Sequence, residues 1–263
     1  MSWSYKKLPN QNSRIALITG ANSGLGFETC KALSRSGASL IMACRSLEKG
    51  EEARRKLLTI HNLGFLDLFI LDLSDLNDVN RFVGEIKSSY SRIDILVNNA
   101  GIMAPPFSFT KQGFELQFGV NHLAHMALTL KLFPLLLQSP FARVVTVSSG
   151  AQYIAKINWD NIQGEKSYNR WAAYSQSKLA NVMFALELEE RCRLFQIPIS
   201  SLIAHPGLVR TNLQTTYLAK HHRFLDSLAY KIISPVFQTP RNGSLSQVRA
   251  ATDPMAVGGE QYG

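Results

Sequence analysis

Short apolar runs alternate with longer amphipathic stretches along most of the chain, and glycines or polar residues separate them. Continuous apolar runs of this length are typical of strands that are buried on both faces of a sheet. The longer stretches repeat their apolar residues at helical spacing. The pattern predicts strands at 14–19, 39–44, 66–71, 93–97, 143–147 and 198–204. It predicts helices at 26–36, 47–61, 76–90, 113–138 and 171–195.

This alternation predicts an α/β fold, a Rossmann-type doubly wound parallel sheet with right-handed crossovers. We expect a single domain over residues 14–263, preceded by a polar, loose N-terminal arm over 1–13. The stretch 113–138 is apolar almost all round, so we expect a buried or interface helix that Pro134 disturbs locally.

Beyond residue 208 the pattern loosens. Residues 215–237 mix apolar and basic side chains, within a candidate substrate lid at 212–240. Two interpretations are open: a helix packed on the substrate side of the sheet, or a mobile lid that also rests on anionic lipid.

Composition narrows the functional classes. The chain has 263 residues, 46% of them hydrophobic and 18% charged, which is typical of a globular protein with a large core. Its net charge is +9, but the basic residues are scattered, so we expect no nucleic-acid partner. No apolar stretch is long enough to span a membrane. We expect a cytoplasmic protein, with weak peripheral membrane contact as an open alternative.

The cysteines indicate neither disulfides nor a metal. Cys30, Cys44 and Cys192 are odd in number, form no paired motif and lie in apolar contexts, so we expect buried reduced thiols. No cluster of histidine, cysteine or acidic residues has metal-ligand spacing, so we expect no metal site. His122 and His125 are interpreted as core or interface residues.

Tyr174 and Lys178 are the first candidates for chemistry. They lie four residues apart in a predicted helix, so they share one face. An ammonium beside a phenol favours the phenolate and lowers the phenol pKa. A tyrosine tuned in this way can exchange a proton at physiological pH. The spacing alone also fits an ordinary surface pair.

A glycine turn follows the first predicted strand. Gly20, Gly24 and Gly26 let the backbone approach a pyrophosphate, and the next helix presents its N-terminal amides to that charge. Dinucleotide sites that select NAD place an acidic residue after the second strand. Here Arg45 stands at that place, which predicts NADP(H), because a guanidinium can bind a 2′-phosphate. A solvated arginine at a strand end is the alternative.

Taken together, these motifs resemble the short-chain dehydrogenase/reductase family across nearly the whole chain. The resemblance rests on a TGxxxGxG motif at 19–26, an NNAG element at 98–101 and a PGxxxT segment at 206–211. It implies a catalytic tetrad of Asn121, Ser149, Tyr174 and Lys178, with Ser149 and Tyr174 contacting substrate. Ser149 is preferred to Ser148 because the family places its serine second in such a pair. It also implies that the cofactor contacts Gly20, Asn22, Ser23, Gly24, Leu25, Gly26, Arg45, Asp72, Leu73, Asn99, Ala100, Gly101, Tyr174, Lys178, Pro206, Gly207 and Thr211.

The segment 163–169 and Ala43-Cys44-Arg45 are similar to the retinol-dehydrogenase-like branch. The branch implies an NADP(H)-dependent oxidoreductase that interconverts an alcohol and an aldehyde or ketone of lipophilic character, such as a retinoid, a steroid or a long-chain aldehyde. It also implies a homodimer, and a water held by Asn121 that links Lys178 to solvent.

Two departures from the branch matter. Its membrane-bound members carry an N-terminal membrane helix that is absent here. Residue 263 also falls short of where such chains usually finish, so we expect the C-terminal part of the substrate pocket either to be missing or to be supplied by residues outside this sequence. Two other functions stay open: a light-dependent protochlorophyllide-reductase-like reductase of a carbon–carbon double bond, and a catalytically silent NADP(H)-sensing module.

Overall fold

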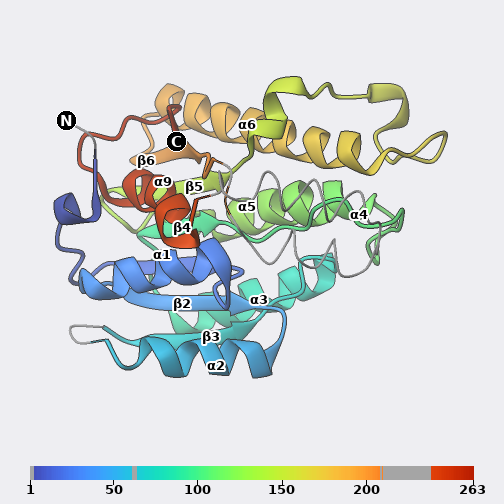
Figure 1. The fold of residues 1–263 in the computed structure, drawn as a ribbon. Coiled ribbons are helices and arrows are strands. Elements are labelled where there is room, and N and C mark those ends of the chain that lie inside the picture. Colours follow the sequence, from blue (N-terminus) through green and yellow to red (C-terminus); the bar gives the residue numbers. More distant parts are fainter. Residues whose placement is uncertain (1–2, 61–63, 208, 210–237) are drawn as a thin grey trace.

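A parallel sheet forms the centre of the molecule (Figure 1). The structure is a computed structural model that describes residues 3–60, 64–207, 209 and 238–263. Its seven strands lie in the order β3-β2-β1-β4-β5-β6-β7, and every neighbouring pair is parallel. The Rossmann-type prediction is therefore confirmed. The strands are β1 (Ile15–Thr19), β2 (Ser39–Cys44), β3 (Leu66–Ile70), β4 (Ile95–Asn98), β5 (Ala142–Val147), β6 (Ile199–Ala204) and β7 (Gln261–Tyr262).

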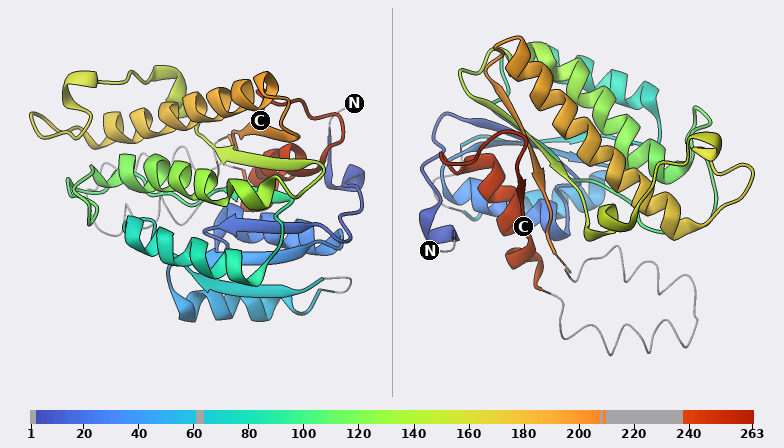
Figure 2. Two further views of the ribbon diagram at one scale, coloured as in Figure 1. Left: turned by 180° about the vertical axis from the view of Figure 1, so that it is seen from behind. Right: turned by 90° about the horizontal axis from the view of Figure 1, so that it is seen from above.

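Helices cover both faces of this sheet (Figure 2). One face carries α1 (Gly24–Arg35), α2 (Leu47–Leu57) and α9 (Pro240–Thr252). The other carries α3 (Leu76–Ser89), α5 (Ala124–Leu136) and α6 (Arg170–Leu194). Short helical turns complete the order: η1 (Tyr5–Lys7), α4 (Leu116–Phe118), η2 (Gly119–Leu123), η3 (Gly150–Ile154) and η4 (Trp159–Asn161).

Two apolar cores result, one on each face. Alternate residues of a strand point to opposite sides, so Leu17 joins the core under α3 and α5, while Ala16 and Ile18 join the core under α1 and α9. The chain order reverses between β1 and β4, the two central strands that start the two halves. In open α/β sheets a ligand binds outside the carboxyl ends of the strands at such a point.

The prediction of a single helix over 113–138 is wrong, because the structure divides this stretch into α4, a π-helical turn (η2) and α5. A π-turn inserts one residue into the helical ladder and is frequent at functional sites, and here it contains Asn121. Pro134 lies in the last turn of α5, which ends at Leu136.

The N-terminal arm is not loose from residue 3 onward. The Tyr5 hydroxyl donates to the backbone oxygen of Arg241 at 2.6 Å and lies 2.7 Å from Ser244 Oγ, so the arm is tied to α9. Gln11 is buried. The polar sequence concealed this contact because the bonds are to a helix that the sequence pattern did not predict.

The sequence pattern did not predict the two C-terminal elements, α9 and β7. Thr239 caps α9, accepting a bond from the Asn242 backbone at 3.3 Å, and Pro240 occupies the first turn. A threonine followed by proline is a recognised helix start, and this signal could have identified the helix. β7 has only two residues, too few for a periodic pattern.

Candidate active site

The four residues of the predicted tetrad converge at the carboxyl end of β5. Ser149 follows this strand, Tyr174 and Lys178 lie in α6, and Asn121 lies in η2. The Ser149 hydroxyl lies near enough to the Tyr174 phenol to lower its pKa, and Lys178 Nζ lies 5.8 Å from the centre of the Tyr174 ring. A Cβ atom at Gly101 would lie 3.2 Å from Asn121 Oδ1 and 3.7 Å from Lys178 Nζ, so this glycine admits both side chains.

Polar contacts fix α6 against β5. Lys178 Nζ donates to the backbone oxygen of Val147 at 3.1 Å, and Asn181 Nδ2 donates to the same oxygen at 3.2 Å. Ser148 Oγ donates to the Lys178 backbone oxygen at 2.9 Å. Ser148 therefore binds the helix backbone while Ser149 faces Tyr174, as successive strand residues require. The role of Asn181 was not predicted from the sequence.

The start of α6 is equally well defined. Asn169 is its N-cap, and its Oδ1 accepts bonds from the backbone nitrogens of Trp171 at 3.0 Å and Ala172 at 3.1 Å. Such a cap stabilises a helix by about 1 kcal/mol. Because α6 then runs unbroken, Tyr174 and Lys178 stay one turn apart on the same face.

Asn121 is fully buried, and its side chain binds protein groups. Its Oδ1 accepts from Ile102 N at 2.8 Å, and its Nδ2 donates to Ile102 O and to Ser177 Oγ, both at 3.0 Å. The side chain thus joins the loop after β4 to α6. Asn121 Oδ1 keeps one lone pair that these bonds do not use, and the water-holding role stays a prediction.

The protonation states differ from the prediction for Tyr174. Burial raises the pKa of the Tyr174 phenol above its usual value, and the hydrogen bond from Ser149 only partly opposes this effect. Burial lowers the pKa of Lys178 to about 8. In the absence of a ligand, desolvation therefore outweighs the attraction between ammonium and phenolate. At neutral pH Tyr174 is a protonated phenol and most Lys178 side chains are charged.

The glycine turn between β1 and α1 has the shape that a pyrophosphate needs. Gly20 and Gly24 have φ angles of 65° and 55°, which side-chain-bearing residues rarely adopt. A Cβ atom at Gly26 would lie 2.3 Å from Gly20 O, so the close contact requires glycine there. No atom of the described residues would lie within 4 Å of a Cβ at Gly24, so among them this edge of the turn is open. Ser23 precedes α1 without capping it through its side chain, which leaves helix amides for an anion.

The other predicted cofactor contacts lie along the same edge of the sheet. Arg45 follows β2, is exposed, and has no ion-pair partner within the described ranges. Asp72 and Leu73 follow β3, where Asp72 Oδ1 accepts from Ser74 Oγ at 2.7 Å. Asn22 and Leu25, in the glycine turn and the start of α1, are half-buried.

The PGxxxT segment is only partly described. Pro206 and Gly207 follow β6, and Gly207 has a φ angle of 69°. Thr211 and nearly all of the candidate lid at 212–240 lie outside the described residues. The residues that are described fit a dinucleotide: a glycine cradle, open helix amides and a free guanidinium after β2.

A side chain of α9 holds the NNAG element at 98–101 through a hydrogen bond to Asn99. Asn99 Nδ2 donates to Thr19 O at 2.7 Å, and Asn99 Oδ1 accepts from Gln247 Nε2 at 3.1 Å. Gln247 is fully buried, and its Oε1 accepts from Thr29 Oγ1 at 2.9 Å. Gln247 was missed because α9 was missed. Ala100 and Gly101 continue the element towards Asn121.

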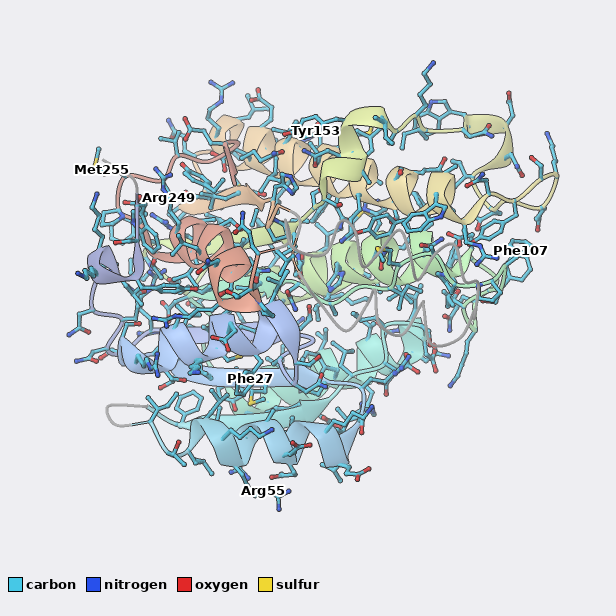
Figure 3. The ribbon with its side chains drawn as sticks, viewed as in Figure 1. Phe27, Arg55, Phe107, Tyr153, Arg249 and Met255 are labelled. Carbon is cyan, nitrogen blue, oxygen red and sulfur yellow. The ribbon has the colours of Figure 1, made fainter. Side chains whose placement is uncertain are left out.

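Apolar side chains are exposed near the tetrad. Tyr153 and Ile154 in η3 are 70% and 85% exposed, and Trp159 in η4 is 72% exposed. Phe107, on the loop after β4, packs against Tyr168 with ring centres 4.8 Å apart. Figure 3 labels Tyr153 and Phe107 on the outer surface of the molecule. Loops of this character are suited to contact a lipophilic molecule.

The described part of the chain offers neither a metal-binding cluster nor a membrane-spanning helix. Those residues contain no group of three or more histidine, cysteine, aspartate or glutamate side chains that could hold a metal ion. None of the helices described is both long and apolar enough to cross a membrane. The three cysteines are free and buried, as predicted, and burial raises the pKa of the Cys44 thiol to about 12.

Comparison with known proteins places this site in a family. The family model for short chain dehydrogenases matches residues 14–222. Human retinol dehydrogenase 14 is 40% identical over 261 residues, covering 94% of this chain and 76% of that protein. A crystal structure of an uncharacterised protein from Mycobacterium paratuberculosis is 39% identical with a TM-score of 0.79, covering 99% of this chain and 84% of that one.

A more distant structure shares the fold alone. L-sorbose reductase from Gluconobacter frateurii, complexed with NADPH and L-sorbose, has a TM-score of 0.77 at 18% identity, covering 96% of this chain and 95% of that one. The fold and the family match define an oxidoreductase, and the chain belongs to the short-chain dehydrogenase/reductase family. Within that family it belongs to the retinol-dehydrogenase-like branch.

Proposed function

We propose that the protein is an NADP(H)-dependent oxidoreductase that interconverts a lipophilic alcohol and its aldehyde or ketone. The observation that carries this proposal is the meeting of Ser149, Tyr174 and Lys178 beside the glycine cradle at the carboxyl edge of the sheet. Retinoids, steroids and long-chain aldehydes are the substrate classes proposed. The exposed aromatic and aliphatic side chains of η3 and η4 support a lipophilic substrate.

The side chains suit proton transfer to a carbonyl oxygen. When bound, NADPH supplies the hydride. Ser149 lies near enough to Tyr174 to lower the pKa of the phenol, so both hydroxyls can reach one substrate oxygen, where Ser149 stabilises developing charge. The raised pKa of Tyr174 keeps the phenol protonated at neutral pH, which suits its role as the acid in carbonyl reduction.

Lys178 has capacity for a further partner. Within the described residues its ammonium donates one hydrogen bond, to Val147 O, although it carries three N–H groups. A buried cation with unused donors is unfavourable. We propose that the remaining donors bind the ribose of the nicotinamide cofactor, which would compensate the buried ammonium and keep it charged beside Tyr174.

Arg45 supports NADP(H) over NAD(H). It stands where an acidic residue would select NAD, and its exposed guanidinium is free to bind a phosphate. Lys49, one turn further on in α2, is also exposed. The first turn of α2 also carries the acidic residue Glu48, so the proposed 2′-phosphate would lie near one negative side chain as well as the two positive ones.

Two further partners are proposed. Leu130 of α5 and Met183 and Leu186 of α6 are 51%, 45% and 46% exposed, and such apolar surface on these two helices supports a homodimer.

We also propose peripheral membrane contact, which the exposed η3 and η4 side chains support as an entry route for an apolar substrate.

The test is a panel of retinal, steroid ketones, long-chain aldehydes and polar aldehydes, scored by NADPH oxidation. We expect turnover with one of the three lipophilic classes. Tyr174→Phe should lower kcat at least about 100-fold, since a general acid contributes roughly 10²–10⁴, while NADPH still binds. Tyr90→Phe is the matched control, because the Tyr90 hydroxyl donates to Asp67 in β3, far along the sheet from β5.

Three results would contradict the proposal. No turnover despite tight NADPH binding would favour a silent sensing module. Reduction of a carbon–carbon double bond in place of the carbonyl would favour the double-bond reductase. Retention of more than about a tenth of kcat by Tyr174→Phe would mean that another group is the acid.

A further inference from the structure

A buried histidine joins the cofactor loop to the helix that carries Asn121. His125 lies in the first turn of α5 and is 2% exposed. Its Nε2 lies 2.9 Å from Thr19 Oγ1, at the end of β1, and its Nδ1 lies 3.1 Å from the backbone oxygen of Asn121. One imidazole ring therefore contacts both Thr19, at the cofactor loop, and the backbone of Asn121.

Donor and acceptor counting assigns the direction of these bonds. Thr19 Oγ1 accepts the backbone N–H groups of Asn99 and Ala100, both at 2.9 Å. These two bonds use both hydroxyl lone pairs, so Thr19 must donate its own proton. His125 Nε2 at 2.9 Å is a nearer acceptor than Val97 O at 3.4 Å. Nε2 is then unprotonated, and the ring proton is on Nδ1, which donates to Asn121 O.

The surroundings keep the ring neutral. Burial lowers the pKa of His125 to about 4, and the positive charge of Lys178 lowers it further. A second proton on Nε2 would also face a threonine oxygen whose acceptor positions are filled. The chain of bonds thus has one direction, from the backbone of Asn99 and Ala100 through Thr19 and His125 to the Asn121 carbonyl.

We propose that His125 is a positioning residue that couples the cofactor site to Asn121 through this hydrogen-bonded chain. On one side it orients Thr19, which holds the NNAG backbone against β1. On the other it orients the Asn121 carbonyl, which lies within η2. The inference rests on the proposed function, because it presumes that NADPH binds beside the NNAG element.

The tautomer can be read in the unmodified protein. Long-range nitrogen–proton NMR spectra of protein with labelled histidine distinguish a ring protonated at Nδ1 from one protonated at Nε2. We expect the Nδ1–H form for His125 across the neutral pH range. The Nε2–H form, or a doubly protonated ring at neutral pH, would overturn the proposal. This measurement needs no substrate and no variant that must fold.

Two substitutions separate the two bonds. His125→Asn keeps a donor near the Nδ1 position and loses the acceptor for Thr19, so the Kd for NADPH should rise about tenfold, with kcat at saturating NADPH within about threefold. His125→Gln keeps an acceptor that reaches Thr19 and loses the donor to Asn121 O. Its Kd should stay within about threefold while kcat falls about tenfold.

His122 offers the matched control. It lies one turn earlier, binds Asn181 Oδ1 at 3.3 Å, and touches neither Thr19 nor the Asn121 carbonyl. His122→Asn should leave the Kd for NADPH within about threefold of its normal value. Equal effects of His125→Asn and His125→Gln on both quantities would overturn the proposal and leave a packing role. If the protein turns over no carbonyl substrate, the tautomer and the split in NADPH affinity still decide the inference.

Discussion

Lys178 should destabilise the ligand-free protein, although it is a candidate catalytic residue. Its side chain is 5% exposed and, among the residues that the structure describes, meets no carboxylate. Burial lowers the pKa of Lys178 from 10.5 to about 8. Lys178→Met removes the charge and keeps a side chain of similar length. We therefore expect this variant to be more stable than the unmodified protein at pH 7 when NADPH is absent.

The magnitude follows from the pKa shift. A pKa that falls from 10.5 to about 8 corresponds to about 3 kcal/mol of unfavourable interaction for the charged form. The substitution also loses the bond to Val147 O, worth about 1 kcal/mol. That oxygen keeps its bond from Asn181 Nδ2 at 3.2 Å, so it is not left unsatisfied. The net gain is about 2 kcal/mol, or roughly 4–8 °C in Tm.

The gain should depend on pH in a defined direction. Between pH 8 and 10.5 the unfolded chain binds more protons at this position than the folded one, so stability from this group rises with pH. The advantage of Lys178→Met is therefore largest below pH 8 and fades towards pH 10.5. Urea unfolding at pH 7 and pH 10 measures it, with the exposed Lys131→Met as control. A loss of stability at pH 7 would refute the reasoning.

Three other predictions address the cofactor, the assembly and the C-terminal helix. Arg45→Asp should reverse a preference for NADPH over NADH that is on the order of tenfold to a hundredfold. Equal Kd values for the two cofactors in the unmodified protein would contradict this expectation. Leu186→Glu should convert a dimer into a monomer at tens of micromolar by light scattering, whereas an unmodified monomer would rule out the dimer. Gln247→Leu should lower the free energy of unfolding by about 1–3 kcal/mol, because Asn99 and Thr29 lose buried partners. A change below about 0.5 kcal/mol would mean that water replaces the amide.

The sheet was predictable because its signal is local. β1, β2 and β5 are short, mostly apolar runs, and each predicted boundary lies within two residues of the observed one. The π-turn at Asn121 was not predictable in the same way. Inserting one residue into a helical ladder leaves the composition of the segment apolar, so a pattern of residue types does not reveal it.

In the site, the sequence identifies which residues are present but not the surroundings that set their protonation. Motifs identified Ser149, Tyr174, Lys178 and Asn121, because their types and spacing are distinctive. The protonation of Tyr174 was not predictable from the neighbouring Lys178, because the pKa depends on burial as well as on charge. Gln247 and His125 were missed as supporting residues, since their partners lie far away in sequence and only the folded chain brings them together.

The features that destabilise the free protein are the features that a dinucleotide would satisfy. In the described part of the chain, Lys178 has donors without protein partners, Ser23 leaves α1 uncapped by its side chain, and no atom would lie within 4 Å of a Cβ at Gly24. A ligand that binds only the folded state stabilises it by about 2.7 kcal/mol at a concentration 100 times its Kd. Lys178→Met lacks the donors that NADPH would engage, so it should gain less from the cofactor than the unmodified protein does. Melting temperatures should therefore favour Lys178→Met without NADPH, and the difference should shrink or reverse at saturating NADPH. An equal shift in both proteins would mean that Lys178 makes no contact with the cofactor.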